Sequence, residues 1–338
     1  MVEVGIIGIG GWGKNLLRTF YSLPGVRVAA AADLVEERRA DAAEKYPGLN
    51  LIGDHREIMG DPAIEAVVVA TPGATHHRLV MEALAAGKDV YVEKPMALSA
   101  QDCREIVAKA QAEERIVMVG HLLLYHPAVV KMKEELDAGN LGDPYYLYAQ
   151  RLNLGKIRRS ENALWTFAPH DISVALHLIG AEPVSVSAWG ESYVQPEVED
   201  VVFARIAFPG KVMAHIHVSW LDPHKVRKIT LVGSRKMMVF DDMDKNAPLR
   251  IYDKGVPEDL EYDSYGEYLT LRYGDEYVPA VRAGEPLGLE CAHFVECVRE
   301  RRFPLTDGRN GLRAVRVLEA AQESLRRGGK VIALNEER

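Results

Sequence analysis

The first 120 residues or so alternate between short apolar runs and amphipathic stretches. The apolar runs predict strands at residues 4–9, 26–32, near 51, 66–70, 89–92 and 116–119. The stretches between them predict helices at residues 14–23, 35–46, around 56, 75–86 and 99–113, the last with Ser99 as its N-cap. Strands that alternate with helices form a parallel sheet with helices on both faces. The pattern therefore predicts a doubly wound α/β domain over residues 1–121.

The pattern changes after His121. One helix is expected at residues 127–138, and alternating or β-branched segments then predict strands at residues 144–154, 183–194, 201–208, 212–220 and 225–232. The segment Phe208-Pro209-Gly210-Lys211 predicts a hairpin turn between two of these strands. Residues 288–327 return to helical periodicity. Successive strands form a largely antiparallel sheet that leaves one face open, so residues 122–338 are expected to form an α+β domain.

The first apolar run ends in the turn Gly8-Ile9-Gly10-Gly11-Trp12-Gly13, a GxGxxG pattern between a predicted strand and a predicted helix. In a dinucleotide fold the three glycines allow a tight turn, close approach of the pyrophosphate and helix packing. Such turns also occur wherever a chain reverses tightly, but the flanking elements favour a dinucleotide site.

An acidic residue, Asp33, ends the second predicted strand. A carboxylate about 20 residues past the turn accepts hydrogen bonds from the ribose hydroxyls and repels a 2′-phosphate. Arg38 and Arg39 lie a helical turn farther along and are not expected to restore NADP binding. The sequence therefore predicts NAD as the cofactor.

Composition narrows the class of protein. The chain has 338 residues, enough for two domains, with 48% hydrophobic and 27% charged residues, which are ordinary globular values. No apolar run reaches membrane-spanning length, and the first residues already have a strand pattern, so neither a signal nor a transit peptide is expected. Cys103, Cys291 and Cys297 form no CxxC pair, which suits a cytoplasmic protein. The net charge of −8 without a basic stripe argues against nucleic acid as a partner.

Chemically active residues follow three of the predicted parallel strands. They are Thr71, Pro72 and His76 after the fourth strand, Glu93-Lys94-Pro95 after the fifth and Gly120-His121 after the sixth. Ligands bind α/β sheets beyond the carboxyl ends of the strands. A lysine there can donate a hydrogen bond to a substrate oxygen, although position alone equally fits a solvated surface lysine.

The segments GIIGIGGWGKN and ATPGATHHRLVMEALAAGKDVYVEKP, with a mixed second domain, resemble the Gfo/Idh/MocA oxidoreductase family over most of the chain. The resemblance implies an NAD(P)-dependent sugar or cyclitol dehydrogenase with Lys94 in the active site. It also implies a homodimer or homotetramer formed through the open sheet. The cofactor contacts it implies are Gly8, Ile9, Gly10, Gly11, Trp12, Gly13, Asp33, Thr71, Pro72, His76, Glu93, Lys94 and His121.

The family also places a catalytic histidine on a second-domain helix, in a pattern like DxGxHxxD. Here the matching segment is LWTFAPHDIS, in which His170 aligns with that histidine. Thr166 and Ser173 replace the two aspartates, and Thr166 is a candidate substrate contact together with Lys94 and His170. Asp171 is expected on another face of the helix. The resemblance implies a catalytic pair of Lys94 and His170, in which the member that takes the hydroxyl proton varies across the family. The ordinary pKa of an imidazole favours His170 as the base, with Lys94 donating to the developing alkoxide. A structural role for His170 is the alternative.

Three segments, LWxxAPHDIS, GHLLLYHPA and PLTDGRNGL, are similar to a family branch that acts on nucleotide sugars, including the 3-dehydrogenases of UDP-N-acetylglucosamine and its uronic acid. That similarity implies oxidation at C3 of a UDP-N-acetylhexosamine or its uronic acid. A diphosphate needs cationic donors, for which the candidates are Arg151, Lys156, Arg158 and Arg159, although a solvated basic loop is an equal alternative. Weaker pocket candidates, which also fit packing or turn roles, are Tyr125, His126 and Asn153.

Two other functions remain open. A free-sugar or inositol dehydrogenase would have no use for a diphosphate clamp, and a non-catalytic dinucleotide sensor would keep the cofactor site without turnover. No metal is expected, because none of the histidines at 76, 77, 121, 126, 170 and 177 lies in an HExxH or similar pattern.

Overall fold

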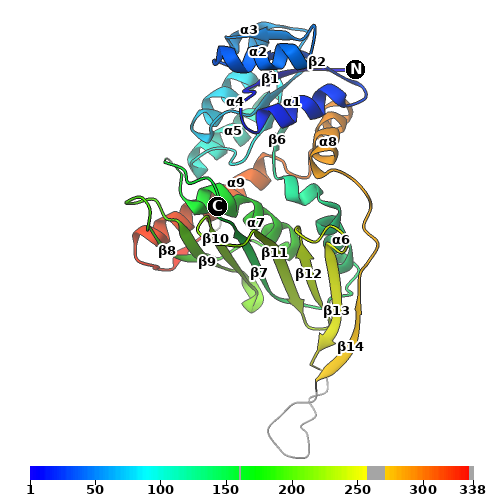
Figure 1. The fold of residues 1–338 in the computed structure, drawn as a ribbon, viewed down its shortest axis with the longest axis vertical. Coiled ribbons are helices and arrows are strands. Elements are labelled where there is room, and N and C mark those ends of the chain that lie inside the picture. The colour runs from blue at the N-terminus through cyan, green and yellow to red at the C-terminus, as the bar shows by residue number, and fades with distance from the viewer. Residues whose placement is uncertain (160, 257–270, 335–338) are drawn as a thin grey trace, which may run out of the picture. The chain divides into compact units, whose positions relative to one another are not determined.

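A computed structural model describes residues 1–159, 161–256 and 271–334 (Figure 1). The chain divides into two compact units. Unit 1 comprises Met1–Tyr125 and Gly284–Arg316, and unit 2 comprises His126–Ala283 and Val317–Arg338. Each unit contains one sheet and its own buried apolar core.

Unit 1 contains a six-stranded sheet in the order β3-β2-β1-β4-β5-β6, in which every pairing is parallel. The strands are β1 (Val2–Ile7), β2 (Val26–Ala32), β3 (Asn50–Ile52), β4 (Ala66–Val69), β5 (Asp89–Val92) and β6 (Val117–Val119). The helices between them are α1 (Gly13–Ser22), α2 (Glu36–Lys45), α3 (Arg56–Gly60), η1 (Gly73–Thr75), α4 (His76–Ala85) and α5 (Ala100–Ala112). The predicted doubly wound α/β fold is confirmed.

The burial of these elements explains why the apolar pattern predicted them. Strands β4 and β5 are buried at every position, as expected for strands covered on both faces. Helix α1 buries one stripe that includes Leu16, Leu17 and Phe20. At the start of α5, the Ser99 hydroxyl accepts a hydrogen bond from the Asp102 amide at 3.0 Å, which confirms the predicted N-cap.

Helix α8 (Pro286–Glu300) packs in unit 1. Its Phe294 is fully buried and meets Phe20 and Tyr91 edge-on, with ring centroids 6.2 and 5.8 Å apart. The boundary predicted after His121 places residues 284–316 in the second domain, and the structure corrects this. The helical periodicity showed that α8 has an apolar face, but a sequence pattern does not show which sheet that face covers.

Unit 2 contains a nine-stranded sheet in the order β14-β13-β12-β11-β7-β10-β9-β8-β15. Its strands are β7 (Pro144–Leu152), β8 (Ser185–Glu191), β9 (Val201–Ala207), β10 (Met213–Ser219), β11 (Val226–Gly233), β12 (Met237–Asp241), β13 (Leu249–Gly255), β14 (Arg272–Tyr277) and β15 (Ile332–Ala333). Among the pairings of the described strands, only β7–β10 is parallel, so the predicted largely antiparallel sheet is confirmed. The turn at η3 (Pro209–Lys211), with Gly210 at φ 71°, confirms the predicted hairpin.

The helices of unit 2 lie on one face of this sheet (Figure 1). Helix α7 (Ala163–Ile179) crosses β7, β9 and β10, and α6 (Pro127–Asp137) packs beside α7 and β12. The chain also contains η2 (Leu122–Tyr125) and α9 (Gly308–Arg326), which runs through the end of unit 1 into unit 2. Within the described parts of the chain, no helix is both long and apolar enough to span a bilayer.

Candidate active site

At two positions of the glycine turn after β1, the backbone leaves no room for a side chain. Gly8 has φ 90°, and a Cβ there would lie 2.8 Å from the Ala70 carbonyl oxygen. A Cβ at Gly13 would lie 2.0 Å from the Gly8 carbonyl oxygen. Gly11 faces open space, so the turn presents backbone and the amides at the start of α1. This cradle fits the pyrophosphate of a dinucleotide.

Asp33 is buried and held against the glycine turn. Its Oδ2 accepts a hydrogen bond from the Ile9 amide and its Oδ1 from the Val35 amide, both at 2.9 Å. The Arg38 guanidinium lies 3.4 Å from both carboxylate oxygens, and Arg39 donates to the Asp33 carbonyl at 2.6 Å. Both arginines therefore contact Asp33, because the first turn of α2 folds back over it, and the expectation that they do not restore NADP binding stays a prediction.

We expect the protein to prefer NAD to NADP by at least about 10-fold in kcat/KM, because Asp33 repels a 2′-phosphate. The double variant Asp33→Ser with Leu34→Arg should shift this preference toward NADP, since Arg38 is already in place to pair with a phosphate. Leu34→Arg alone, at a residue that is 88% exposed, is the control. Steady-state kinetics with both nucleotides measure the ratio. Equal or better use of NADP by the unaltered protein would contradict the role given to Asp33.

His76 joins the loops that follow β4 and β5. It is buried, with Nδ1 2.7 Å from the Pro95 carbonyl oxygen and Nε2 2.8 Å from the Thr71 carbonyl oxygen. Thr71 lies beside the glycine turn, since a Cβ at Gly8 would lie 2.9 Å from its Cγ2. Thr71 is therefore placed for cofactor contact, whereas His76 holds the two loops together. Pro72 is exposed at the same loop.

The residues after β5 and β6 form the polar centre of unit 1. The Lys94 amide donates to Glu93 Oε2 at 3.3 Å, and the Trp12 side chain also hydrogen-bonds the Glu93 carboxylate. Burial raises the pKa of Glu93 to about 7, although Lys94 and Trp12 oppose that shift. His121 is 1% exposed, and burial together with the Lys94 charge lowers its pKa to about 3. His121 is therefore a neutral imidazole beside Lys94.

His170 lies on α7 in unit 2, where it is partly buried. The helix starts at Asn162, whose side chain accepts from the Trp165 amide at 3.1 Å. Thr166 is buried, and Ser173 donates its hydroxyl to the His170 carbonyl at 2.8 Å. Neither Thr166 nor Ser173 supplies the carboxylate that the family pattern places near this histidine, as their replacement of the two aspartates indicated.

Asp171, the residue next to His170, forms an ion pair with Arg151. Its two carboxylate oxygens accept from Nε and Nη2 of Arg151 at 2.8 and 2.9 Å, and both side chains are buried. Arg151 is thus engaged in an internal bidentate ion pair, which corrects its predicted role as a diphosphate donor. Lys156, Arg158 and Arg159 are exposed, and Arg158 pairs with Glu161 at 2.8 Å. Asn153 is partly buried just beyond the end of β7.

Arg151→Ala should lower the free energy of unfolding by about 3 kcal/mol, because it leaves the Asp171 carboxylate buried without its cation. Urea unfolding followed by circular dichroism measures the change. The matched control is Arg158→Ala, which breaks an exposed pair and should cost less than about 1 kcal/mol. Similar losses in the two variants would show that the buried pair has no special role in stability.

Tyr125 and His126 each have a hydrogen-bond partner within the fold, and their assignment as pocket candidates stays a prediction. The Tyr125 hydroxyl is buried and lies 3.0 Å from the Thr306 hydroxyl, and burial raises its pKa. His126 is the N-cap of α6, where Nδ1 accepts from the Ala128 amide at 3.1 Å. Sequence spacing did not show either partner.

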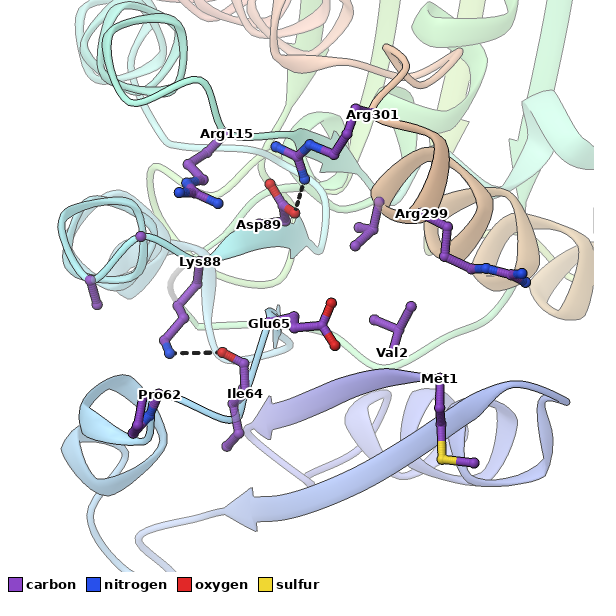
Figure 2. A pocket seen from close by; sticks show the side chains of 13 residues that line it. Met1, Val2, Pro62, Ile64, Glu65, Lys88, Asp89, Arg115, Arg299 and Arg301 are labelled. Atoms are coloured by element: carbon purple, nitrogen blue, oxygen red, sulfur yellow. Dashed lines mark hydrogen bonds and ion pairs between the residues drawn. The ribbon is translucent and has the colours of Figure 1, made fainter.

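A hollow opens at the amino ends of β1 and β5 (Figure 2). Lys94 follows β5 and therefore lies at the opposite, carboxyl end of that strand. Two of the cations that line the hollow, Lys88 and Arg301, have partners within unit 1. Lys88 donates to the carbonyls of Asp61 and Ile64 at 2.6 and 2.7 Å, and Arg301 pairs with Asp89. Because the glycine turn and Lys94 lie at the carboxyl ends, we do not place the substrate in this hollow.

One group of side chains has metal-ligand spacing. His77 on α4 and Asp102 and Glu105 on α5 offer ligand atoms that all lie within 4.8 Å of one another. His77 Nε2 is 3.0 Å from Glu105 Oε2, so the group already forms an ion pair when the histidine is protonated. Sequence spacing did not indicate this group, because its ligands come from two helices. All three side chains keep contact with solvent, and the expectation of no metal stays a prediction.

Two family models match the chain, and the gap between the two matched segments falls close to the domain boundary that the sequence pattern predicted. Residues 2–121 match the oxidoreductase family with an NAD-binding Rossmann fold, and residues 129–239 match the GFO/IDH/MocA C-terminal domain.

The similarity to individual proteins covers nearly the whole chain. The chain is 26% identical over 343 residues to scyllo-inositol 2-dehydrogenase (NAD+) of Bacillus subtilis, covering 97% of this chain and 95% of the relative. A crystal structure of an oxidoreductase from Magnetospirillum magnetotacticum is 30% identical, with a TM-score of 0.81 and coverage of 95% and 99%. UDP-N-acetylglucosamine 3-dehydrogenase GnnA from Acidithiobacillus ferrooxidans is 23% identical, with a TM-score of 0.81 and coverage of 96% and 97%, a likeness of fold.

Proposed function

The chain belongs to the Gfo/Idh/MocA family of NAD-binding oxidoreductases, and on that basis we propose that it oxidises a secondary hydroxyl of a free cyclitol or sugar. The observation that carries the choice of a free substrate is the buried Arg151–Asp171 pair, which removes the best-placed diphosphate donor. The relative from Bacillus subtilis, whose name specifies an inositol as substrate, supports the same choice.

The nucleotide-sugar alternative loses support at the residues that suggested it. Arg158 already has an acidic partner, and Lys156 and Arg159 are solvated side chains of the loop after β7. Exposed cations of this kind are common on loops without any phosphate ligand. The likeness to the enzyme from Acidithiobacillus ferrooxidans concerns the fold and carries no substrate preference.

The residues of the chain divide the proposed reaction between them. The glycine turn and Asp33 hold the cofactor, which supplies a nicotinamide ring able to accept hydride. The Lys94 ammonium donates a hydrogen bond to the substrate oxygen and stabilises the alkoxide that develops on it. His170 accepts the hydroxyl proton, as a neutral imidazole can. His121, kept neutral by burial, adds no second positive charge beside Lys94.

An absorbance assay at the NADH band with inositols, free hexoses and UDP-sugars tests the proposal. We expect NADH formation with members of the first two groups and little with the third. Turnover confined to UDP-sugars would reject the free substrate in favour of the nucleotide-sugar alternative. NAD binding without turnover on any member of the panel would support a sensor.

We also infer that copies of the chain associate through the open face of the sheet in unit 2. Register pairs Trp189 with Phe203, and Phe203 with His217, across three neighbouring strands. The Phe203 and His217 rings stack at 4.1 Å, and Phe203 is 39% exposed. The same face carries further exposed apolar side chains, namely Tyr146, Tyr148 and Met213. Such a surface is typical of protein interfaces.

Phe203→Glu should therefore convert the oligomer to monomers, because each interface would bury a carboxylate without a partner. Sedimentation velocity measures the state of assembly. Tyr193→Glu is the control, since Tyr193 is an exposed aromatic residue that lies beyond the end of β8. An unaltered sedimentation coefficient for Phe203→Glu would place the interface elsewhere.

A further inference from the structure

Helix α8 places a carboxyl group, Glu290, inside the core of unit 1. Its side chain is 1% exposed, and Oε1 has no hydrogen-bond partner among the described residues. The other oxygen, Oε2, is 2.9 Å from the Tyr91 hydroxyl. No described cation pairs with Glu290, and an ionised carboxylate is strongly disfavoured in such surroundings. Burial, with the nearby Glu93 charge, raises its pKa well above the ordinary range, so Glu290 carries a proton at neutral pH.

Tyr91 connects Glu290 to a second carboxyl group. Its hydroxyl also lies 3.5 Å from Glu93 Oε1, and its buried ring packs edge-on against Phe20 and Phe294. A Cβ at Gly120 would lie 2.8 Å from the Tyr91 hydroxyl and 3.1 Å from Glu93 Oε1. The glycine therefore lets β6 close over the tyrosine and Glu93, and the ring packing fixes where the hydroxyl points.

The number of available hydrogens limits how these three groups can bond. A tyrosine hydroxyl has one hydrogen, so it can donate to only one of the two carboxyl groups. If both were ionised, one of them would lose the Tyr91 hydroxyl as a donor while two negative charges shared a buried site. With one proton on Glu290, its carboxyl donates to the Tyr91 oxygen, and Tyr91 donates to Glu93. That arrangement uses every available hydrogen.

The surroundings decide which carboxyl is ionised. Glu93 has the Lys94 charge and the Trp12 hydrogen bond beside it, both of which favour its carboxylate. At the other end, the neighbour of Glu290 is the buried Cys291 thiol, which burial and Glu290 keep uncharged by raising its pKa. His121 is neutral and adds no charge. Glu93 is therefore the carboxyl group that is ionised.

We propose that Glu290, Tyr91 and Glu93 form a chain that shares one proton, held on Glu290, so that Glu93 presents a negative charge to Lys94. Tyr91 is a positioning residue in this chain, because its hydroxyl stabilises the ionised Glu93. The ionised Glu93 in turn keeps Lys94 an ammonium. The consequence for catalysis rests on the proposed function of Lys94, whereas the location of the proton is a property of the protein without substrate.

Infrared spectroscopy of the substrate-free protein tests where the proton lies. At pH 8 exposed carboxyl groups are ionised, so we expect a C=O band of a protonated carboxyl that Glu290→Gln removes. Cys291→Ser, a change at the adjacent buried residue, should keep that band. Absence of the band at pH 8, or its survival in Glu290→Gln, would overturn the proposal.

A second band should grow as the pH falls through about 7, where Glu93 takes up its own proton. Tyr91→Phe keeps the aromatic packing and should raise that midpoint by about 1 pH unit, because the Glu93 carboxylate loses a donor. The matched control is Tyr125→Phe, which removes a buried hydroxyl bonded to Thr306 instead of a carboxyl. An unchanged midpoint in Tyr91→Phe would refute the chain. Since neither measurement uses a substrate, both can succeed even if polyol oxidation fails its own assay.

Discussion

Lys94→Met is expected to lower kcat by about 10²- to 10⁴-fold while leaving the dissociation constant for NAD nearly unchanged. The side chain follows β5, at the edge of the sheet where the glycine turn and Asp33 also lie. Methionine has similar length but cannot donate a hydrogen bond to an alkoxide or carry positive charge. The effect should therefore fall on the chemical step, because Lys94 holds no phosphate of the cofactor.

Steady-state kinetics and titration of NAD binding by fluorescence separate these two effects. Lys109→Met is the control, because Lys109 forms an exposed pair with Glu113 on α5 and should give ordinary kinetics. A Lys94→Met protein with near-normal kcat would remove the lysine from the mechanism. A protein that had lost NAD affinity instead would show that Lys94 acts through cofactor binding and not through the chemical step.

His170→Ala is expected to cause a loss of similar size, about 10²- to 10⁴-fold in kcat, with NAD binding retained. Removing hydride from a carbinol carbon requires its hydroxyl proton to leave, and the imidazole is the proposed acceptor. Added imidazole should restore part of the rate, which a purely structural role would not allow. Near-normal kcat with an unchanged pH profile would leave Lys94 as the sole acid–base group.

Regular apolar patterns were the part of the fold that the sequence predicted best. The predicted bounds of β2 and β5 agree with the structure residue for residue, because each is a short apolar run between clear breaks. Strands β12 to β15 were not predicted. Strand β14, with the sequence RYGDEY, is largely exposed and polar, so no alternation marks it. The packing of α8 in unit 1 depends on contacts between segments far apart in the chain.

In the candidate site, too, roles that depend on local spacing were predictable, whereas roles that depend on contacts between distant segments were not. The glycine turn and Asp33 were predictable because their chemistry depends on local spacing. The roles of Arg151 and Tyr125 were not, since Asp171 and Thr306 reach them only through the fold. Glu290 was missed although a signal was present: it shares the i, i+4, i+7 spacing of the buried Phe294 and Cys297. A carboxylate on the apolar face of a helix is a candidate for a protonated group.

In the proposed reaction, the substrate loses hydride from its carbinol carbon and NAD accepts it. The most direct measurement uses the preferred substrate from the assay panel, deuterated at the carbon that bears the oxidised hydroxyl, with mass spectrometry of the nicotinamide product. We expect NADH that carries the deuterium, formed by the unaltered protein and at a greatly reduced rate by Lys94→Met. Reduced cofactor without deuterium, or a ketone product formed without reduced cofactor, would contradict it.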